Sequence, residues 1–146
     1  MTYAQNRNHF NEYLKKNRCK ELHFVGVIYL DLNGLKEIND KMGHLAGDTL
    51  IIGASYVLQE IFADNSYRIG GDEFVVIEQD VLESEFYSKY EMLLKRMKEL
   101  EISVATGYIW KERCLNLSEI LQAADQKMYE DKKRYYSIAQ KDQRRR

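Results

Sequence analysis

A short tract near the middle of the chain combines two glycines with two adjacent carboxylates, directly ahead of an apolar run. It reads Arg68-Ile69-Gly70-Gly71-Asp72-Glu73-Phe74-Val75-Val76-Ile77. Glycine tolerates positive φ and lets a ligand approach the backbone, and the apolar run is typical of a buried strand. The tract therefore predicts a β-hairpin whose acidic tip could grip metal-bound phosphate. An ordinary hairpin turn with solvated carboxylates is the alternative.

A second segment rich in polar side chains follows the apolar run from Leu22 to Leu30. Between Asp31 and Asp48 it contains acids, amides and a lysine in one passage from strand to helix. Mg²⁺ keeps several of its waters and prefers octahedral oxygen ligands, so a few carboxylates are enough to hold it on a triphosphate. Asp31 and Asp72 would supply that small set if the fold brings them together. Turns, helix caps and surface positions would explain the same side chains separately.

The elements that must position these residues follow from hydrophobic periodicity. We expect helices over residues 6–18, 35–42, 45–62, 82–99 and 117 to about 135, and strands over 22–30, 67–69, 74–77 and 102–110. Without the flanking helices, the order is strand, helix, strand, strand, helix, strand, which is a split βαβ core with its helices on one face of an antiparallel sheet. The predicted fold is α+β, of the ferredoxin-like or palm type. Asp31 and Asp72 then end or turn neighbouring central strands.

Length and composition favour a single domain over residues 1–146. The chain is 45% hydrophobic and 31% charged, with a formal net charge of −1. This balance gives no broad attraction to nucleic acid or to a membrane surface, and no apolar stretch approaches the roughly 20 residues that span a bilayer. Cys19 and Cys114 have neither metal-ligand spacing nor enough partners for a disulfide framework. We therefore expect a cytoplasmic domain that contacts neither nucleic acid nor membrane.

Taken together, the motifs resemble those of the GGDEF family of diguanylate cyclase domains. The resemblance rests on the segment from Asp31 to Asp48, the tract from Arg68 to Phe74, and the segment from Ala124-Asp125 to Lys132. The opening Thr2-Tyr3-Ala4-Gln5-Asn6-Arg7 is similar to the family's Thr-Gly-Leu-x-Asn-Arg. The family joins two GTP molecules into cyclic di-GMP and releases two pyrophosphates, as each 3′-hydroxyl attacks the α-phosphate of the other nucleotide. The resemblance implies GTP as substrate, a homodimer for catalysis, and a place at the C-terminal end of a larger signalling protein.

The resemblance also implies roles for individual residues. Asp31, the carbonyl of Leu32, Asp72 and Glu73 would hold Mg²⁺ or Mn²⁺. Asp72 would in addition accept the proton, and Glu73 would assist catalysis through a second ion. Lys36 would neutralise charge that develops on the phosphates.

A second group of residues would bind the nucleotide. Asn39 and Asp48 match the pair that recognises guanine, because a carboxylate accepts from the N1 and N2 donors that adenine lacks. His44 matches a position that contacts substrate, and Gly70 and Gly71 would let the nucleotide approach the backbone. Lys132, in Tyr129-Glu130-Asp131-Lys132, would reach phosphate from the last helix.

Two departures from the family pattern bear on function. Tyr136 stands where the family often has a phosphate-binding arginine, and Lys133 or Arg134 would approach from another direction because a helix turns about 100° per residue. We therefore expect weakened triphosphate binding unless one of these two side chains compensates. The segment Ile61-Phe62-Ala63-Asp64 keeps the aspartate of the family's product-binding Arg-x-x-Asp element and lacks its arginine, so ordinary product inhibition is not expected.

Three functions remain open from the sequence. An active diguanylate cyclase accounts for the intact Asp31, Asp72 and Glu73. A catalytically inactive GTP-binding or protein-interaction module accounts for Tyr136 and the altered opening motif. An adenylyl or mixed-dinucleotide cyclase is the third, because fold does not fix substrate, although Asp48 favours guanine.

Overall fold

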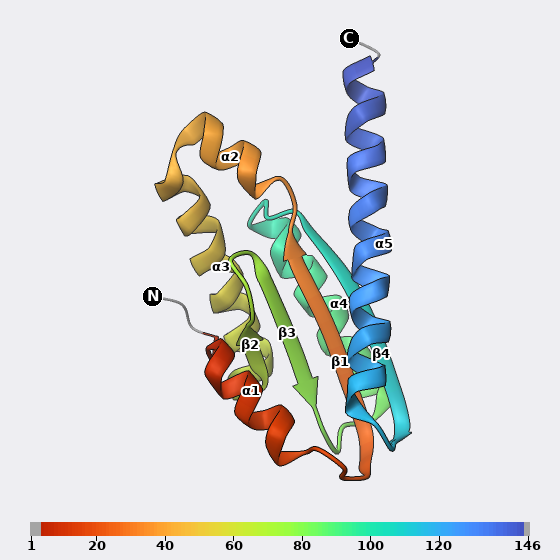
Figure 1. Cartoon of the computed structure of the whole chain (residues 1–146). Helices are drawn as coiled ribbons and strands as arrows, with labels where there is room; N and C mark the ends of the chain where they lie inside the picture. Colours follow the sequence, from red (N-terminus) through yellow and green to blue (C-terminus); the bar gives the residue numbers. More distant parts are fainter. Residues whose placement is uncertain (1–3, 145–146) are drawn as a thin grey trace.

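The order of elements along the chain is the predicted one, and a computed structural model places them in space (Figure 1). The structure describes residues 4–144, with the side chains of residues 4–140. Thr2 and Tyr3 of the opening motif lie outside the described residues. The elements are α1 (Arg7–Lys16), β1 (Leu22–Leu32), α2 (Leu35–Met42), α3 (His44–Phe62), the 3₁₀ turn η1 (Ala63–Asn65), β2 (Ser66–Arg68), β3 (Glu73–Glu78), α4 (Glu83–Glu99), β4 (Val104–Cys114) and α5 (Leu117–Arg144).

The four strands form one sheet in the order β2-β3-β1-β4, with every neighbouring pair antiparallel. This is the split βαβ order that the sequence predicts, so the α+β prediction is confirmed. β1 lies inside the sheet, between β3 and β4. Its register runs from Gly26 opposite Glu78 to Asp31 opposite Glu73 on the β3 side.

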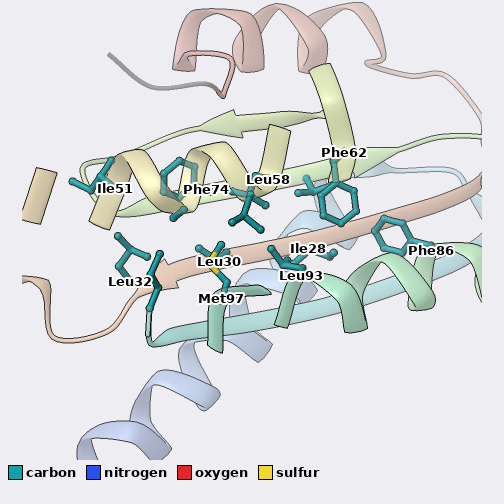
Figure 2. Close-up of a cluster of buried hydrophobic side chains, with 14 of the residues drawn as sticks. Ile28, Leu30, Leu32, Ile51, Leu58, Phe62, Phe74, Phe86, Leu93 and Met97 are labelled. Atoms are coloured by element: carbon teal, nitrogen blue, oxygen red, sulfur yellow. The ribbon is translucent and has the colours of Figure 1, made fainter. Parts of the chain in front are cut away.

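Helices cover both faces of the sheet. The two core helices, α3 and α4, lie on one face as expected, and the flanking helices α1 and α5 lie on the other (Figure 1). Figure 2 shows the first layer, in which side chains of β1 and β3 pack against α3 and α4. Its labelled members are Ile28, Leu30, Leu32, Ile51, Leu58, Phe62, Phe74, Phe86, Leu93 and Met97. The second layer joins β1, β3 and β4 to Phe10 of α1 and to Leu117, Ile120, Leu121 and Ala124 of α5.

The alternation of side chains along β1 decides where its carboxylate points. Successive residues of a strand face opposite sides of the sheet. Ile28 and Leu30 belong to the α3 and α4 layer, whereas Val27 and Tyr29 pack in the α1 and α5 layer. Asp31 has the parity of Val27 and Tyr29, and it therefore points to the face that α5 covers.

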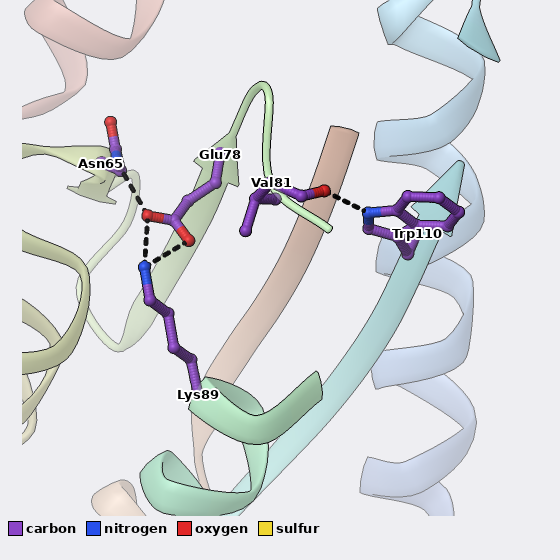
Figure 3. Close-up of polar contacts among 5 residues, drawn as sticks. All are labelled: Asn65, Glu78, Val81, Lys89 and Trp110. Atoms are coloured by element: carbon purple, nitrogen blue, oxygen red, sulfur yellow. Dashed lines mark hydrogen bonds and ion pairs between the residues drawn. The ribbon is translucent and has the colours of Figure 1, made fainter. Parts of the chain in front are cut away.

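The opposite end of the β1–β3 ladder is fixed by polar contacts (Figure 3). The buried carboxylate of Glu78 accepts hydrogen bonds from Lys89 Nζ of α4 at 3.1 and 3.2 Å and from Asn65 Nδ2 at 3.0 Å. The indole Nε1 of Trp110 donates to the carbonyl of Val81 at 2.9 Å. These bonds attach α4 and the loop before it to the sheet, at the end of the ladder away from Asp31.

Most element boundaries agree with the prediction to within two residues, and the larger differences lie at the C-terminal ends of β4 and α5. β1 continues to Leu32, β4 runs over Val104–Cys114, and α5 continues to Arg144. The last part of β4, an edge strand, is hydrophilic because Lys111, Glu112 and Arg113 are exposed, so its apolar signal fades before the strand ends. α5 continues because neither glycine nor proline follows Tyr135 to end it. In Figure 1 its blue C-terminal half projects beyond the sheet.

Among the described helices, none combines the length and the apolar content that crossing a bilayer requires.

Candidate active site

The predicted carboxylates meet at one end of the central strands. Asp31, the second-last residue of β1, lies opposite Glu73, the first residue of β3. Asp72 immediately precedes Glu73, and its carbonyl accepts a hydrogen bond from the amide of Leu32 at 3.1 Å. The structure thus brings together the two acidic segments that the sequence pairs, with Asp31 within β1 rather than just beyond its end.

The glycine turn is held by an arginine on each side. Arg68 donates through Nη2 to the carbonyl of Gly71 at 2.7 Å and through Nε to that of Gly70 at 3.2 Å. Arg7 donates through Nη1 to the carbonyl of Ile69 at 2.6 Å. Neither Gly70 nor Gly71 has a positive φ; the described glycines that do are Gly34 and Gly43.

The space left by having no side chain therefore explains the presence of Gly70 and Gly71 better than backbone freedom does. A Cβ added to Gly71 would meet nothing within 4 Å, and one added to Gly70 would lie 3.3 Å from Glu73 Oε2. The turn leaves open space beside the carboxylates, and the backbone there is accessible to a ligand.

Asp31 carries the most perturbed charge of this cluster. The residue is 3% exposed, and Lys132 of α5 places its Nζ 2.7 Å from Oδ2. Burial raises the pKa of Asp31 to about 6; the Lys132 ammonium opposes this rise, and the neighbouring Asp72 carboxyl adds to it. The other oxygen, Oδ1, is buried without a hydrogen-bond partner in the described part of the chain.

Burial and nearby negative charge also raise the pKa values of neighbouring groups. The pKa of Glu73 is raised, first by burial and then by Asp72 and Asp125. Burial also raises the pKa of the Tyr29 hydroxyl to about 12, and Asp125 and Glu73 add to the rise. A cluster of this kind favours the binding of a cation.

Close packing of α5 on β4 brings Lys132 to this cluster. A Cβ added to Gly107 would lie 1.9 Å from the carbonyl oxygen of Ala124, so only glycine allows the helix to approach so near. One residue before Lys132, the Asp131 carboxylate accepts a hydrogen bond from the amide of Thr106 at 2.9 Å. These contacts fix the height and the rotation of α5 over the sheet.

The predicted guanine-binding residues form a separate group at the α2–α3 turn. The side chain of Asn39 lies against Gly47, where an added Cβ would be 1.9 Å from Oδ1. That Oδ1 is buried and has no hydrogen-bond partner within residues 4–140. Asp48 follows Gly47 and is exposed. Lys36 and His44 are also exposed, and within the same residues their side chains form no hydrogen bond or ion pair.

A groove of about 520 Å³ opens between α2 and α5, beside the acidic cluster. Leu32 and Gly34 line its inner end, and Tyr135 and Tyr136 line the α5 side. Tyr136 also borders a smaller hollow of about 390 Å³ that includes Lys132. The residue that replaces the family's arginine therefore lies next to the lysine predicted to bind phosphate.

Comparisons with known proteins agree with this arrangement. The family model described as "Diguanylate cyclase, GGDEF domain" matches residues 1–136. The chain belongs to the GGDEF family.

Curated relatives of this GGDEF domain are longer proteins. The signaling protein YkoW of Bacillus subtilis (strain 168) is 35% identical over 95% of the chain and 20% of its own length. The probable diguanylate cyclase DgcI of Escherichia coli (strain K12) is 31% identical over 91% of the chain and 30% of its own length. The chain thus spans less than a third of either relative.

A solved structure shares the fold of this GGDEF domain. The GGDEF domain of DgcB from Caulobacter crescentus, crystallised in complex with c-di-GMP, matches with a TM-score of 0.73. The identity is 21%, over 90% of this chain and 85% of that one.

One observation fits the binding of a divalent metal by this GGDEF domain. The unpartnered, buried Oδ1 of Asp31 is the kind of atom that a metal ion satisfies. In the described residues no group of three or more His, Cys, Asp or Glu side chains is already arranged around a metal position. The Lys132 ammonium lies 2.7 Å from the other carboxylate oxygen of Asp31, and the Asp72 carboxyl is close enough to raise the pKa of Asp31.

Sequence reasoning assigned no role to three residues that shape the site. Arg7 and Arg68 hold the glycine turn, and Asp131 positions α5. Arg7 stands in the opening motif and Arg68 immediately precedes Ile69-Gly70-Gly71, so their places in the motifs were available as a signal. The role of Asp131 depends on packing between segments far apart in the chain and has no local signature.

Proposed function

We propose that this domain is a diguanylate cyclase that condenses two GTP molecules into cyclic di-GMP and two pyrophosphates. The observation that carries the proposal is the meeting of Asp31, Asp72 and Glu73 at one end of the sheet, where Asp31 is buried and its Oδ1 has no hydrogen-bond partner among the described residues. Family membership supports this reaction class. The carboxylates of this tract, rather than the fold alone, are what favours synthesis over binding without turnover.

Mg²⁺ or Mn²⁺ would be held by Asp31, the carbonyl of Leu32, Asp72 and Glu73. When bound, such an ion neutralises charge on the triphosphate and on the departing pyrophosphate. Asp72 takes the proton from the attacking 3′-hydroxyl, whose oxygen forms the new bond to the α-phosphorus as the bond to the β-phosphate oxygen breaks. Lys36 and Lys132 place positive charge on the phosphates.

The nucleotide is held between two parts of the domain. Asn39 and Asp48 take the guanine at the α2–α3 turn, with His44 at its edge, and the phosphates lie toward the acidic cluster. A Cβ added at Gly71 would meet nothing within 4 Å, so the glycine turn leaves space for the phosphates. Because each domain presents a single nucleotide, two copies must face each other for both 3′-hydroxyls to react. Its need for GTP favours a cytoplasmic location, within a larger signalling protein.

One feature favours a catalytically inactive GTP-binding module as the second candidate. Tyr136 is 38% exposed and lies beside Lys132, where an arginine would add a second positive charge to the phosphate site. A tyrosine hydroxyl donates one uncharged hydrogen bond, which is weaker than a charge-assisted pair. Such a module would bind GTP without turning it over.

The deciding experiment is a product assay on the concentrated domain. Incubation with GTP and Mg²⁺ or Mn²⁺, followed by mass spectrometry, should yield cyclic di-GMP, and Asp72→Ala should abolish it. Asp40→Ala, an exposed aspartate on α2, is the matched control and should retain product. GTP binding and dimers without any product would favour the inactive module.

A further inference from the structure

The acidic cluster already contains a cation of its own. Lys132 Nζ lies 2.7 Å from Asp31 Oδ2, although the two residues are 101 positions apart in sequence. The Asp31 side chain is 5% exposed and that of Lys132 is 24% exposed. This is a buried pair with one partner near the surface, so Lys132 can move into solvent or onto a ligand while Asp31 cannot.

The position of Lys132 is set by the fold. Asp131, its neighbour, is bonded to the amide of Thr106, and the Thr106 hydroxyl is in turn 2.6 Å from the Tyr90 hydroxyl of α4. Gly107 allows the close approach of α5 at the same level of the sheet. Packing on both faces of the sheet therefore positions Lys132 beside Asp31, so their contact is a feature of the fold.

The Lys132 ammonium and a divalent metal ion would compete for the carboxylate of Asp31. The ammonium of Lys132 uses Oδ2, and Oδ1 lacks a partner in the described chain. A divalent ion on the same carboxylate would lie within a few ångströms of the ammonium, in a poorly solvated place where like charges repel strongly. A bound triphosphate changes this balance, because its negative oxygens offer Lys132 another partner.

We propose that Lys132 is a resident counter-ion that excludes a divalent metal from Asp31 until the nucleotide arrives. It balances the buried carboxylate in the nucleotide-free domain, moves onto the triphosphate when GTP binds, and so makes metal and nucleotide load together. This inference rests on the proposed function. By linkage, if the bound nucleotide raises the affinity for the metal by withdrawing Lys132, the bound metal raises the affinity for the nucleotide by the same factor.

The test is Mn²⁺ binding to the nucleotide-free domain, measured by electron paramagnetic resonance. Lys132→Met removes the competing charge, and Lys132→Gln removes the charge but keeps a hydrogen-bond donor for Asp31. Both variants should bind Mn²⁺ alone about tenfold more tightly than the parent domain, a usual effect of removing a close like charge. Lys127→Met removes a lysine of the same helix that bonds the carbonyl of Tyr108, and it should leave Mn²⁺ affinity unchanged.

A second titration uses a GTP analogue with a methylene bridge between the α- and β-phosphates. With this analogue present the order should reverse, and both Lys132 variants should bind the analogue and Mn²⁺ more weakly than the parent. If Lys132→Met does not fold, Lys132→Gln carries the same expectation. Equal or weaker binding of Mn²⁺ alone by the folded variants, or no Mn²⁺ binding by any form, would overturn the proposal. Because the first titration uses no nucleotide, its result is independent of whether the domain makes cyclic di-GMP.

Discussion

Gly107 of β4 and Ala124 of α5 meet backbone to backbone. A Cβ atom at position 107 would lie 1.9 Å from the carbonyl oxygen of Ala124 and 2.7 Å from the amide nitrogen of Met128. No rotamer change can relieve such a clash, because both contacted atoms are main chain. The position of α5, and with it that of Lys132, depends on the absence of this one methyl group.

Gly107→Ala should therefore destabilise the domain by about 3 kcal/mol, the upper part of the usual range for overpacked sites. The measurement is unfolding in urea, monitored by circular dichroism. Gly53→Ala is the control, since its Cβ would meet only the end of the Ile102 side chain at 3.3 Å and alanine favours a helix interior. The control should be neutral or up to about 1 kcal/mol more stable. Equal losses in the two variants would refute the role of the backbone contact.

The raised pKa of Asp31 makes stability depend on pH. In the fold its pKa is about 6, against an ordinary value of 3.8, chiefly because the carboxyl is buried. Between these values the folded domain binds more protons than the unfolded chain, so this contribution to stability is present below about pH 4 and is lost as pH rises through 6. Asp31→Asn cannot titrate, and its stability relative to the parent should improve steadily from pH 4 to pH 7.

Urea melts at intervals across that range, with Asp40→Asn as the exposed control, measure this difference. The opposite outcome is a difference in free energy of unfolding between Asp31→Asn and the parent that stays constant with pH, or that turns against Asp31→Asn as pH rises. Either result would mean that the Lys132 ammonium outweighs burial at this site.

The proximity of Asp31 and Asp72, and the strand order that produces it, could be predicted from the sequence. The ion pair between Asp31 and Lys132 could not. An apolar run that ends in Asp31 and a glycine turn that contains Asp72 both have local signatures, and the split βαβ order makes their strands neighbours. The contact with Lys132 joins residues 101 positions apart and depends on how closely α5 packs. The end of α5 was missed for a related reason, because a projecting helix buries little and shows weak periodicity.

Tyr136→Arg should strengthen nucleotide binding. Tyr136 borders the same hollow as Lys132, so an arginine there can add a charge-assisted hydrogen bond to a phosphate. For a partly exposed position we expect about fivefold tighter binding of a non-hydrolysable GTP analogue, measured by calorimetry. Ile138→Arg, exposed and two residues further along α5, adds the same charge in another direction and should change affinity little. A similar gain in both variants would point to general electrostatic attraction.

The domain should not be inhibited by its proposed product at the usual surface. Ile61, the second-last residue of α3, is half-buried against the core at the position where the family's product-binding element has an arginine. Asp64, the remaining member of that element, accepts a hydrogen bond from Gln5 Nε2 at 3.3 Å. A lone carboxylate offers no positive charge to the phosphates of cyclic di-GMP. Titration of the nucleotide-free domain with cyclic di-GMP should therefore give no saturable heat from this surface.

The reverse substitution makes the prediction specific. Ile61→Arg supplies the missing guanidinium, and its aliphatic stem can lie along the apolar surface that Ile61 now covers. Binding of cyclic di-GMP should appear in this variant and disappear again in Ile61→Arg combined with Asp64→Ala, because both charges are needed to hold a phosphate and a guanine edge. Tight binding by the parent that Asp64→Ala removes would show that another cation near Asp64 replaces the arginine.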